Sequence, residues 1–137
     1  MHPWGRLAGI GITLAVALAA RVVEAKESRV SLVVSRVIGP YLEAAEGAKD
    51  VLQSHPIKAT VDWHDLQGDV SQGGEVASTI RLSHPDLIFT IGTEATQLIS
   101  ERFSNIPTVF AMVVRPEAFA AEHPWMAGVS MEVHNMA

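Results

Sequence analysis

The segment that most constrains the fold is Asp86–Thr96, an apolar run that ends in Gly-Thr and passes directly into a helical pattern. A run of Leu, Ile and Phe without strict alternation is typical of a parallel strand covered on both faces. Residues that follow such a strand lie at the carboxyl edge of the sheet, where open α/β folds bind their ligands. A helix that begins there presents unpaired N–H groups and a partial positive charge, which suit a carboxylate or a phosphate. The segment therefore predicts a ligand-binding α/β domain.

The first 25 residues have the pattern of a secretory signal peptide. An apolar run, Leu7–Ala20, is followed by the sequence Val-Glu-Ala, which fits a cleavage site after Ala25. The run is shorter than the roughly 20 residues that span a bilayer, and Arg21 interrupts it. We therefore expect cleavage and a periplasmic domain of residues 26–137; the alternative is an uncleaved anchor helix.

The composition excludes several classes of function. The chain has no cysteine, so it has no disulfide, no thiolate chemistry and no cysteine for lipid attachment. Its formal net charge of −5 becomes −6 when the leader is removed, because the leader carries two arginines and one glutamate. The remaining Lys and Arg residues are scattered, whereas nucleic-acid binding depends on clustered cations. We expect no nucleic-acid partner.

The rest of the chain alternates between strand and helix patterns. This order is the signature of right-handed βαβ units. It predicts a doubly wound, flavodoxin-like parallel sheet of four to five strands, with residues 63–74 as a loop. The expected strands are Arg29–Ser35, Ile57–Asp62 at an edge, Asp86–Ile91, Thr108–Val114 and Ala127–Met131. The expected buried helix faces are Tyr41, Ala44, Ala45, Ala48, Val51 and Leu52; then Val76, Ala77, Ile80 and Leu82; then Ala95, Leu98, Ile99 and Phe103.

Three loops are expected at the carboxyl edge of this sheet: Ser35–Gly39, Gly92–Glu94 and Val113–Pro116. In the functional interpretation, Gly92 and Thr93 hold an anionic ligand group with backbone amides and a hydroxyl. In the alternative, they form an ordinary glycine turn with Thr93 as the helix N-cap. Neither GxGxxG nor GxxxxGK is present. Tyr41 follows the first loop and could stack on a ligand.

The histidines and serines do not form recognisable metal or catalytic motifs. The six histidines show neither HxH nor HxxxH spacing. Three of those after the leader, His55, His84 and His123, precede proline, and two of these three lie where helices are expected to end. Gly-x-Ser-x-Gly is absent. We expect no metal, no cofactor and no enzymatic activity.

Three spaced motifs resemble one family, the substrate-binding proteins of ABC transporters with a type I periplasmic fold. The motifs are Pro85–Ala95, Ile106–Val113 with Pro116, and Ala127–Met131, and the Val33–Ser35 opening is similar as well. The nearest branch is the one associated with aromatic amino acids and related small solutes.

The resemblance implies a lobe that clamps a small solute against a second lobe and delivers it to a membrane permease. The chain ends at Ala137, about where the first crossing to that second lobe would begin, so we expect only the first lobe. The alternative is a non-transporting sensor or interaction lobe, or a lobe that binds only with a second lobe on another chain. The implied ligand-facing positions are Ser35, Gly92, Thr93, Glu94, Val113, Val114, Arg115 and Pro116.

Overall fold

The computed structural model describes residues 27–54 and 58–130, which form a five-stranded parallel sheet in the order β2-β1-β3-β4-β5. The α/β class and the flavodoxin-like arrangement are confirmed. The strands are β1 (Ser28–Val34), β2 (Ala59–Asp65), β3 (Leu87–Ile91), β4 (Thr108–Val113) and β5 (Met126–Ser130). The helices are α2 (Gly39–Ser54), the 3-10 turn η1 (Val70–Gln72), α3 (Gly73–Ser83), α4 (Thr93–Arg102) and α5 (Glu117–Ala120).

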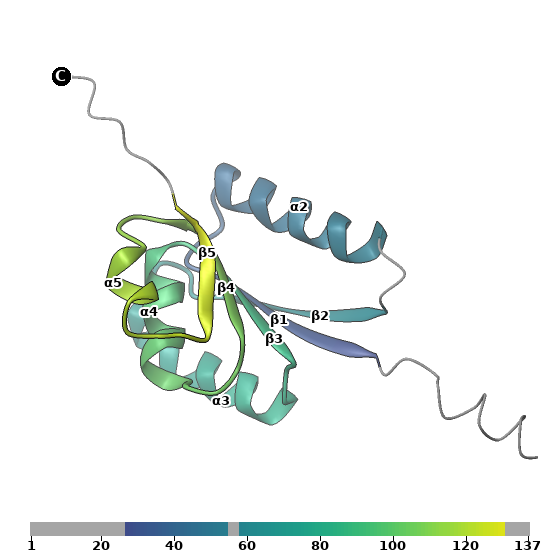
Figure 1. The fold of residues 1–137 in the computed structure, drawn as a ribbon. Helices are drawn as coiled ribbons and strands as arrows, with labels where there is room; N and C mark the ends of the chain where they lie inside the picture. The colour runs from purple at the N-terminus through teal and green to yellow at the C-terminus, as the bar shows by residue number, and fades with distance from the viewer. Residues whose placement is uncertain (1–26, 55–57, 131–137) are drawn as a thin grey trace, which may run out of the picture.

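The helices are divided unequally between the two faces of the sheet. Of the described helices, α2 is the one on the first face, above β1 and β2, whereas α3, α4 and α5 lie on the other (Figure 1). α2 connects β1 to β2, which lies at one edge of the sheet. α3, α4 and α5 lie in connections that run in the opposite direction across the sheet, toward β5. Right-handed crossovers in opposite directions place their helices on opposite faces. The topology therefore fixes this distribution.

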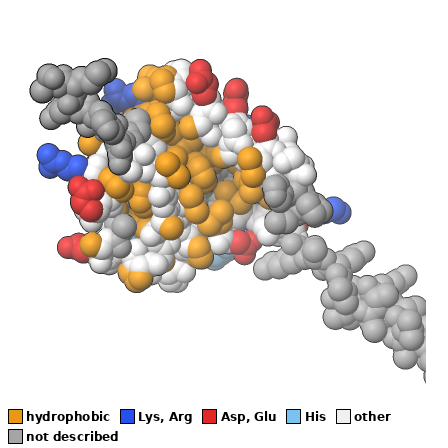
Figure 2. All heavy atoms as spheres, turned by 45° about the horizontal axis from the view of Figure 1, so that its top comes forward, with side chains coloured by type: hydrophobic (Ala, Val, Ile, Leu, Met, Phe, Trp, Pro, Cys, Tyr) orange, Lys and Arg blue, Asp and Glu red, His pale blue; other side chains and the backbone are white. Residues whose placement is uncertain are grey.

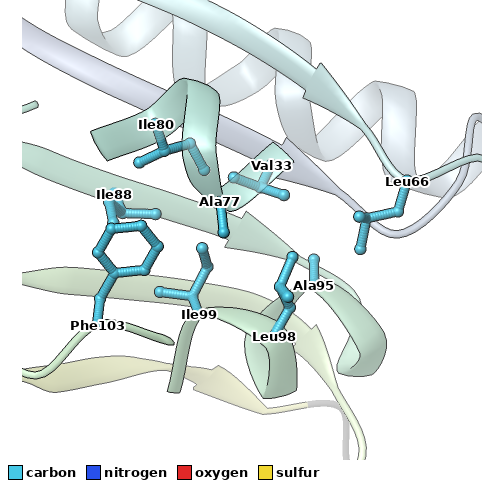
Figure 3. Close-up of a cluster of buried hydrophobic side chains, with 9 residues drawn as sticks. All are labelled: Val33, Leu66, Ala77, Ile80, Ile88, Ala95, Leu98, Ile99 and Phe103. Carbon is cyan, nitrogen blue, oxygen red and sulfur yellow. The ribbon is translucent and has the colours of Figure 1, made fainter. Parts of the chain in front are cut away.

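The largest core cluster lies between the sheet and the α3–α4 layer. Side chains from both helices, from the strands and from the segment after β2 point toward one another (Figure 3). The periodicity of α3 and α4 produces this face, since apolar residues recur every three or four positions. The cluster consists of Val33, Leu66, Ala77, Ile80, Ile88, Ala95, Leu98, Ile99 and Phe103.

Two residues expected in buried helix faces are exposed. Val51 in α2 is 58% exposed and Leu82 in α3 is 82% exposed. Successive residues are turned about 100° around a helix, so Leu82 lies about 200° from Ile80 and points away from the sheet. The buried side of α2 is centred on Ala45 instead, and Val51 lies about 120° from Ala45 around the helix.

The second strand starts and ends later than expected, and the predicted loop over 63–74 is wrong at both ends. β2 continues through Asp65 because it stays paired with β1, up to the pair Val34↔Asp65. Trp63 lies beneath α2, where the ammonium of Lys49 is 5.7 Å from its ring centroid. Polar residues are tolerated because an edge strand is only partly buried. The expected first residue of this strand, Ile57, lies outside the described residues, and α3 already begins at Gly73.

None of the helices in the described ranges is both long and apolar enough to cross a membrane. The expected signal peptide, residues 1–25, lies outside those ranges.

His64 makes the stability of the fold dependent on pH. Burial lowers the pKa of its imidazole, against the raising effect of Asp62, and its Nε2 atom has no partner among the described residues. Below about pH 6.5 the unfolded chain takes up a proton that folded His64 resists, so protonation favours unfolding. We expect the free energy of unfolding to fall as the pH drops through this range, and His64→Gln to reduce that slope. Urea unfolding at pH 5 and pH 7.5 measures the slope; equal slopes for wild type and variant would contradict this assignment.

Candidate functional site at the carboxyl edge of the sheet

The polar groups of interest gather where β1 and β3 end side by side. The helix that follows β1 leaves toward one face, and the helix that follows β3 leaves toward the other. Such a topological switch point is where open α/β sheets bind ligands. The residues just beyond the two strands are Ser35 and Gly92, and the N–H of Ser35 donates to the carbonyl of Ile91 at 2.9 Å.

Gly92 is required at the end of β3 for two reasons. Its φ of 98° and ψ of 161° belong to a region that only glycine occupies readily. A Cβ atom at this position would lie 2.3 Å from Ser35 Oγ and 3.0 Å from Tyr41 Cε2. Glycine thus allows a serine hydroxyl and a tyrosine ring to approach the start of α4.

Ser35 caps the start of α4 from a neighbouring strand. Its hydroxyl oxygen accepts the N–H of Ala95 at 2.9 Å, and its side chain is fully buried. The alternative interpretation, in which Thr93 is the N-cap, is wrong in that detail: the cap position is Gly92 and Thr93 is the first helical residue. Because parallel pairing brings the ends of β1 and β3 together, the serine that follows β1 was the available sequence signal for this cap.

Thr93 connects the first turn of α4 to the loop after β4. Its hydroxyl oxygen accepts the N–H of Val114 at 3.3 Å. Within the described part of the chain, no acceptor bonds the N–H groups of Thr93 and Glu94. Two amides at the positive end of the helix dipole are thus available to an anionic group.

A buried hydroxyl network holds this turn in place, and the sequence analysis did not identify it. Thr96 Oγ1 donates to the carbonyl of Gly92 at 2.8 Å and lies 2.8 Å from Thr90 Oγ1. Both threonines are fully buried. The sequence signal for this network was a threonine inside an apolar strand, followed by a second threonine about one turn after the start of the next helix. Satisfied buried polar groups of this kind fix a single geometry.

A fourth loop, after β2, also reaches the edge. The N–H of Gly68 donates to the carbonyl of Ser35 at 2.8 Å, and Gln67 and Gly68 both have positive φ values, 56° and 69°. The guanidinium of Arg36 lies against Gly68 and forms an ion pair with Glu94 at 3.4 Å. The two charged side chains are 49% and 39% exposed, so solvent screens the pair and it adds little stability. The ion pair leaves both charged groups accessible at the rim of the site, which is formed by the loops around the carboxyl edge.

The apolar part of the rim comes from the loops after β1 and β4. Val37, Ile38 and Val114 are each about half exposed, an unusual position for large apolar side chains. Val113, in contrast, is fully buried in a cluster beneath α5, so its side chain does not face the edge. Pro116 is half-buried and follows Arg115, whose φ is 59°.

The structure therefore brings eight of the nine expected site residues to one edge, Val113 being the exception. Ser35 contributes by capping α4, and Tyr41 by its contact with Gly92. Sequence analysis did not single out Arg36, Val37, Ile38 or the β2 loop. No group of three or more His, Asp or Glu side chains in the described ranges could hold a metal ion. The site offers amides, one hydroxyl, one ion pair and apolar side chains, a set suited to binding a small solute.

No family model matches the sequence, and no curated protein matches it. Solved structures do match the fold. A conserved domain protein of Vibrio cholerae O1 biovar El Tor matches with a TM-score of 0.65 and 22% identity, over 77% of this chain and 39% of that protein. The same values hold for a substrate-binding protein with adhesive properties from Clostridium difficile, in its ligand-free, open form.

An ABC domain from Streptococcus pneumoniae in complex with L-Trp matches with a TM-score of 0.65 and 19% identity, over the same shares of the two chains. The chain thus has the fold of one lobe of a substrate-binding protein, which confirms the fold that the resemblance implied. It spans about two-fifths of the length of these proteins, 39% in each case.

Proposed function

We propose that this chain is the first lobe of a periplasmic solute-binding protein of the ABC-importer type, which passes a small amino-acid-like solute to a membrane permease without catalysis. The observation that carries the proposal is the pair of unbonded amides at Thr93 and Glu94, placed at the topological switch point beside an exposed apolar rim. Two of the matched structures are named as a substrate-binding protein and as a complex with L-Trp, which supports a solute of this class.

The proposed binding mode follows from the chemistry of the edge. A solute carboxylate accepts hydrogen bonds from the two amides, which are stronger for a charged acceptor. A solute ammonium is attracted by Glu94, which Arg36 already pairs at 3.4 Å. The apolar side chain of the solute packs on Val37, Ile38 and Val114. A second lobe would cover the other side of the solute.

The test is a thermal melt of the chain, secreted with its own leader and purified, against a panel of amino acids and small anionic or aromatic solutes. A solute at a hundred times its dissociation constant stabilises the protein by about 2.7 kcal/mol. We expect the melting temperature to rise with an aromatic amino acid and the rise to vanish in Thr93→Val, which lacks the hydroxyl between α4 and the Val114 amide.

Thr79→Val is the matched control, because Thr79 is an exposed helical threonine in α3, away from the edge. It should keep the full solute-dependent rise. A cooperative melt that no solute shifts would refute autonomous binding. It would favour the second candidate, an interaction lobe that works only with another polypeptide, which the exposed Val129 on β5 independently suggests.

A further inference from the structure

Among the described residues, nothing covers one part of the sheet in the way that parallel sheets are normally covered. On the face that carries α2, two apolar rows cross the strands in register: Phe89, Val109 and Ala127, and then Ile91, Ala111 and Val129. Ile91, near α2, is fully buried, but Ala127 is exposed and Val129 is 73% exposed. We call the β4 and β5 part of these rows, Val109, Ala111, Ala127 and Val129, the open strip.

The face of the molecule that carries α2, on which the open strip lies, has an extended hydrophobic surface. Figure 2 shows hydrophobic side chains gathered across the middle of the face that is turned forward from the top of Figure 1, with Asp and Glu side chains at its border. All four residues of the strip are apolar. Because all-parallel sheets occur almost only with both faces covered, such a surface requires a partner.

The dimensions of the strip match one helix. Two strands about 4.8 Å apart make a strip roughly 10 Å wide, which is the diameter of an α-helix with its side chains. Five residues of strand extend for about 16 Å, or about three turns of helix. On the opposite face, α3, α4 and α5 cover the sheet, whereas α2 is the one described helix on the face of the open strip and lies above β1 and β2 (Figure 1).

The handedness of the fold indicates where that helix comes from. Each connection that moves toward β5 places its helix on the α3–α5 face. A right-handed connection from β5 to a further strand at the free edge of β5 would also place its helix on the α3–α5 face. A helix on the open strip therefore is not the next crossover after β5 but belongs to a more distant part of a polypeptide. The matched structures have about three-fifths of their length outside the match, since 39% of each is covered.

We propose that the open strip is the docking surface for one amphipathic α-helix of the second-lobe polypeptide. This rests on the proposed function, because it requires a second lobe. The helix lies beside α2, along β4 and β5, with its apolar stripe on Val109, Ala111 and Val129 and a polar outer face. It anchors the second lobe independently of the solute, which binds at the carboxyl edge.

The test uses a fluorescent 18-residue helical peptide with Leu and Ala at i, i+3, i+4 and i+7 spacing and mixed Glu and Lys elsewhere. A peptide of the same composition with the stripe permuted is the negative control. We expect anisotropy titrations to show binding of the striped peptide only, and at least tenfold weaker binding to Val129→Asp. Val70→Asp is the matched variant, since Val70 is 67% exposed but lies on η1; it should bind like wild type.

In the peptide titrations, three results would overturn the proposal: no binding of the striped peptide, equal binding of both peptides, or equally weakened peptide binding in Val129→Asp and Val70→Asp. In sedimentation experiments, a dimer that dissociates in Val129→Asp but not in Val70→Asp would overturn it as well. The last result would assign the strip to a second copy of the chain. Solute melts of the same samples separate this proposal from the proposed function. A chain that responds to solute but not to peptide refutes the docking surface alone, and the reverse refutes solute binding alone.

Discussion

Replacing Gly92 with alanine is expected to disrupt the site and lower the free energy of unfolding by about 2–4 kcal/mol. Holding a non-glycine residue at a φ of 98° costs about 1–3 kcal/mol. The new Cβ would also meet Ser35 Oγ at 2.3 Å, so the serine must move away from the Ala95 amide that it caps. Loss of such a cap costs about 1 kcal/mol.

Ser35→Ala separates these two causes, because it removes the cap without changing Gly92. We expect it to cost about 1–2 kcal/mol, since it leaves the Ala95 amide without its partner. Gly47→Ala is the control: it lies inside α2 with nothing within 4 Å of the new Cβ, and a helical alanine is favourable by about 0.5–1 kcal/mol. Chemical unfolding measures all three, and a Gly92→Ala protein as stable as wild type would refute this description of the edge.

Gly128→Ala is expected to detach β5 from the sheet. A Cβ at Gly128 would lie 2.1 Å from the backbone carbonyl oxygen of Phe110 and 2.5 Å from its ring. A backbone atom of a central strand cannot move aside, and Phe110 is itself buried against Val113 and Met126. The strand therefore has to separate from β4, which would also expose this part of the core.

We expect a loss of stability of more than about 2 kcal/mol, in the range of severe overpacking. Hydrogen exchange would show loss of protection at the amides of β5 while those of β1 and β3 remain protected. Gly74→Ala, with open space around its new Cβ, should leave the exchange pattern of β5 unchanged. Full protection of β5 in Gly128→Ala would contradict the close β4–β5 approach.

The sequence was sufficient to predict the sheet and the edge but not the bonds within the edge. The apolar run before Gly92 and the helical spacing after it predict β3 and α4, because both patterns arise from burial. The error at Trp63–Asp65 has a different origin: polar residues on an edge strand resemble a loop when pairing with β1 cannot be seen. α5, with only four residues, is too short to show periodicity.

Contacts between distant segments account for the rest of the site. Ser35 and Ala95 are 60 residues apart, and Arg36 and Glu94 are 58 residues apart, so only the strand order brings them together. Once the order β2-β1-β3 is known, the serine after β1 must adjoin the glycine after β3. The orientation of Thr93 toward Val114, rather than toward its own helix, depends on side-chain geometry that no local pattern encodes.

The central claim, that the carboxyl edge binds a small solute, is tested most directly by mapping amide chemical shifts in ¹⁵N-labelled protein titrated with an aromatic amino acid. We predict saturable shifts at Thr93, Glu94 and Val114 and in the loop from Ser35 to Gly39, with little change at the opposite end of the sheet around Arg81 and Arg102. Shifts confined to that opposite end, or none at any solute concentration, would contradict the claim.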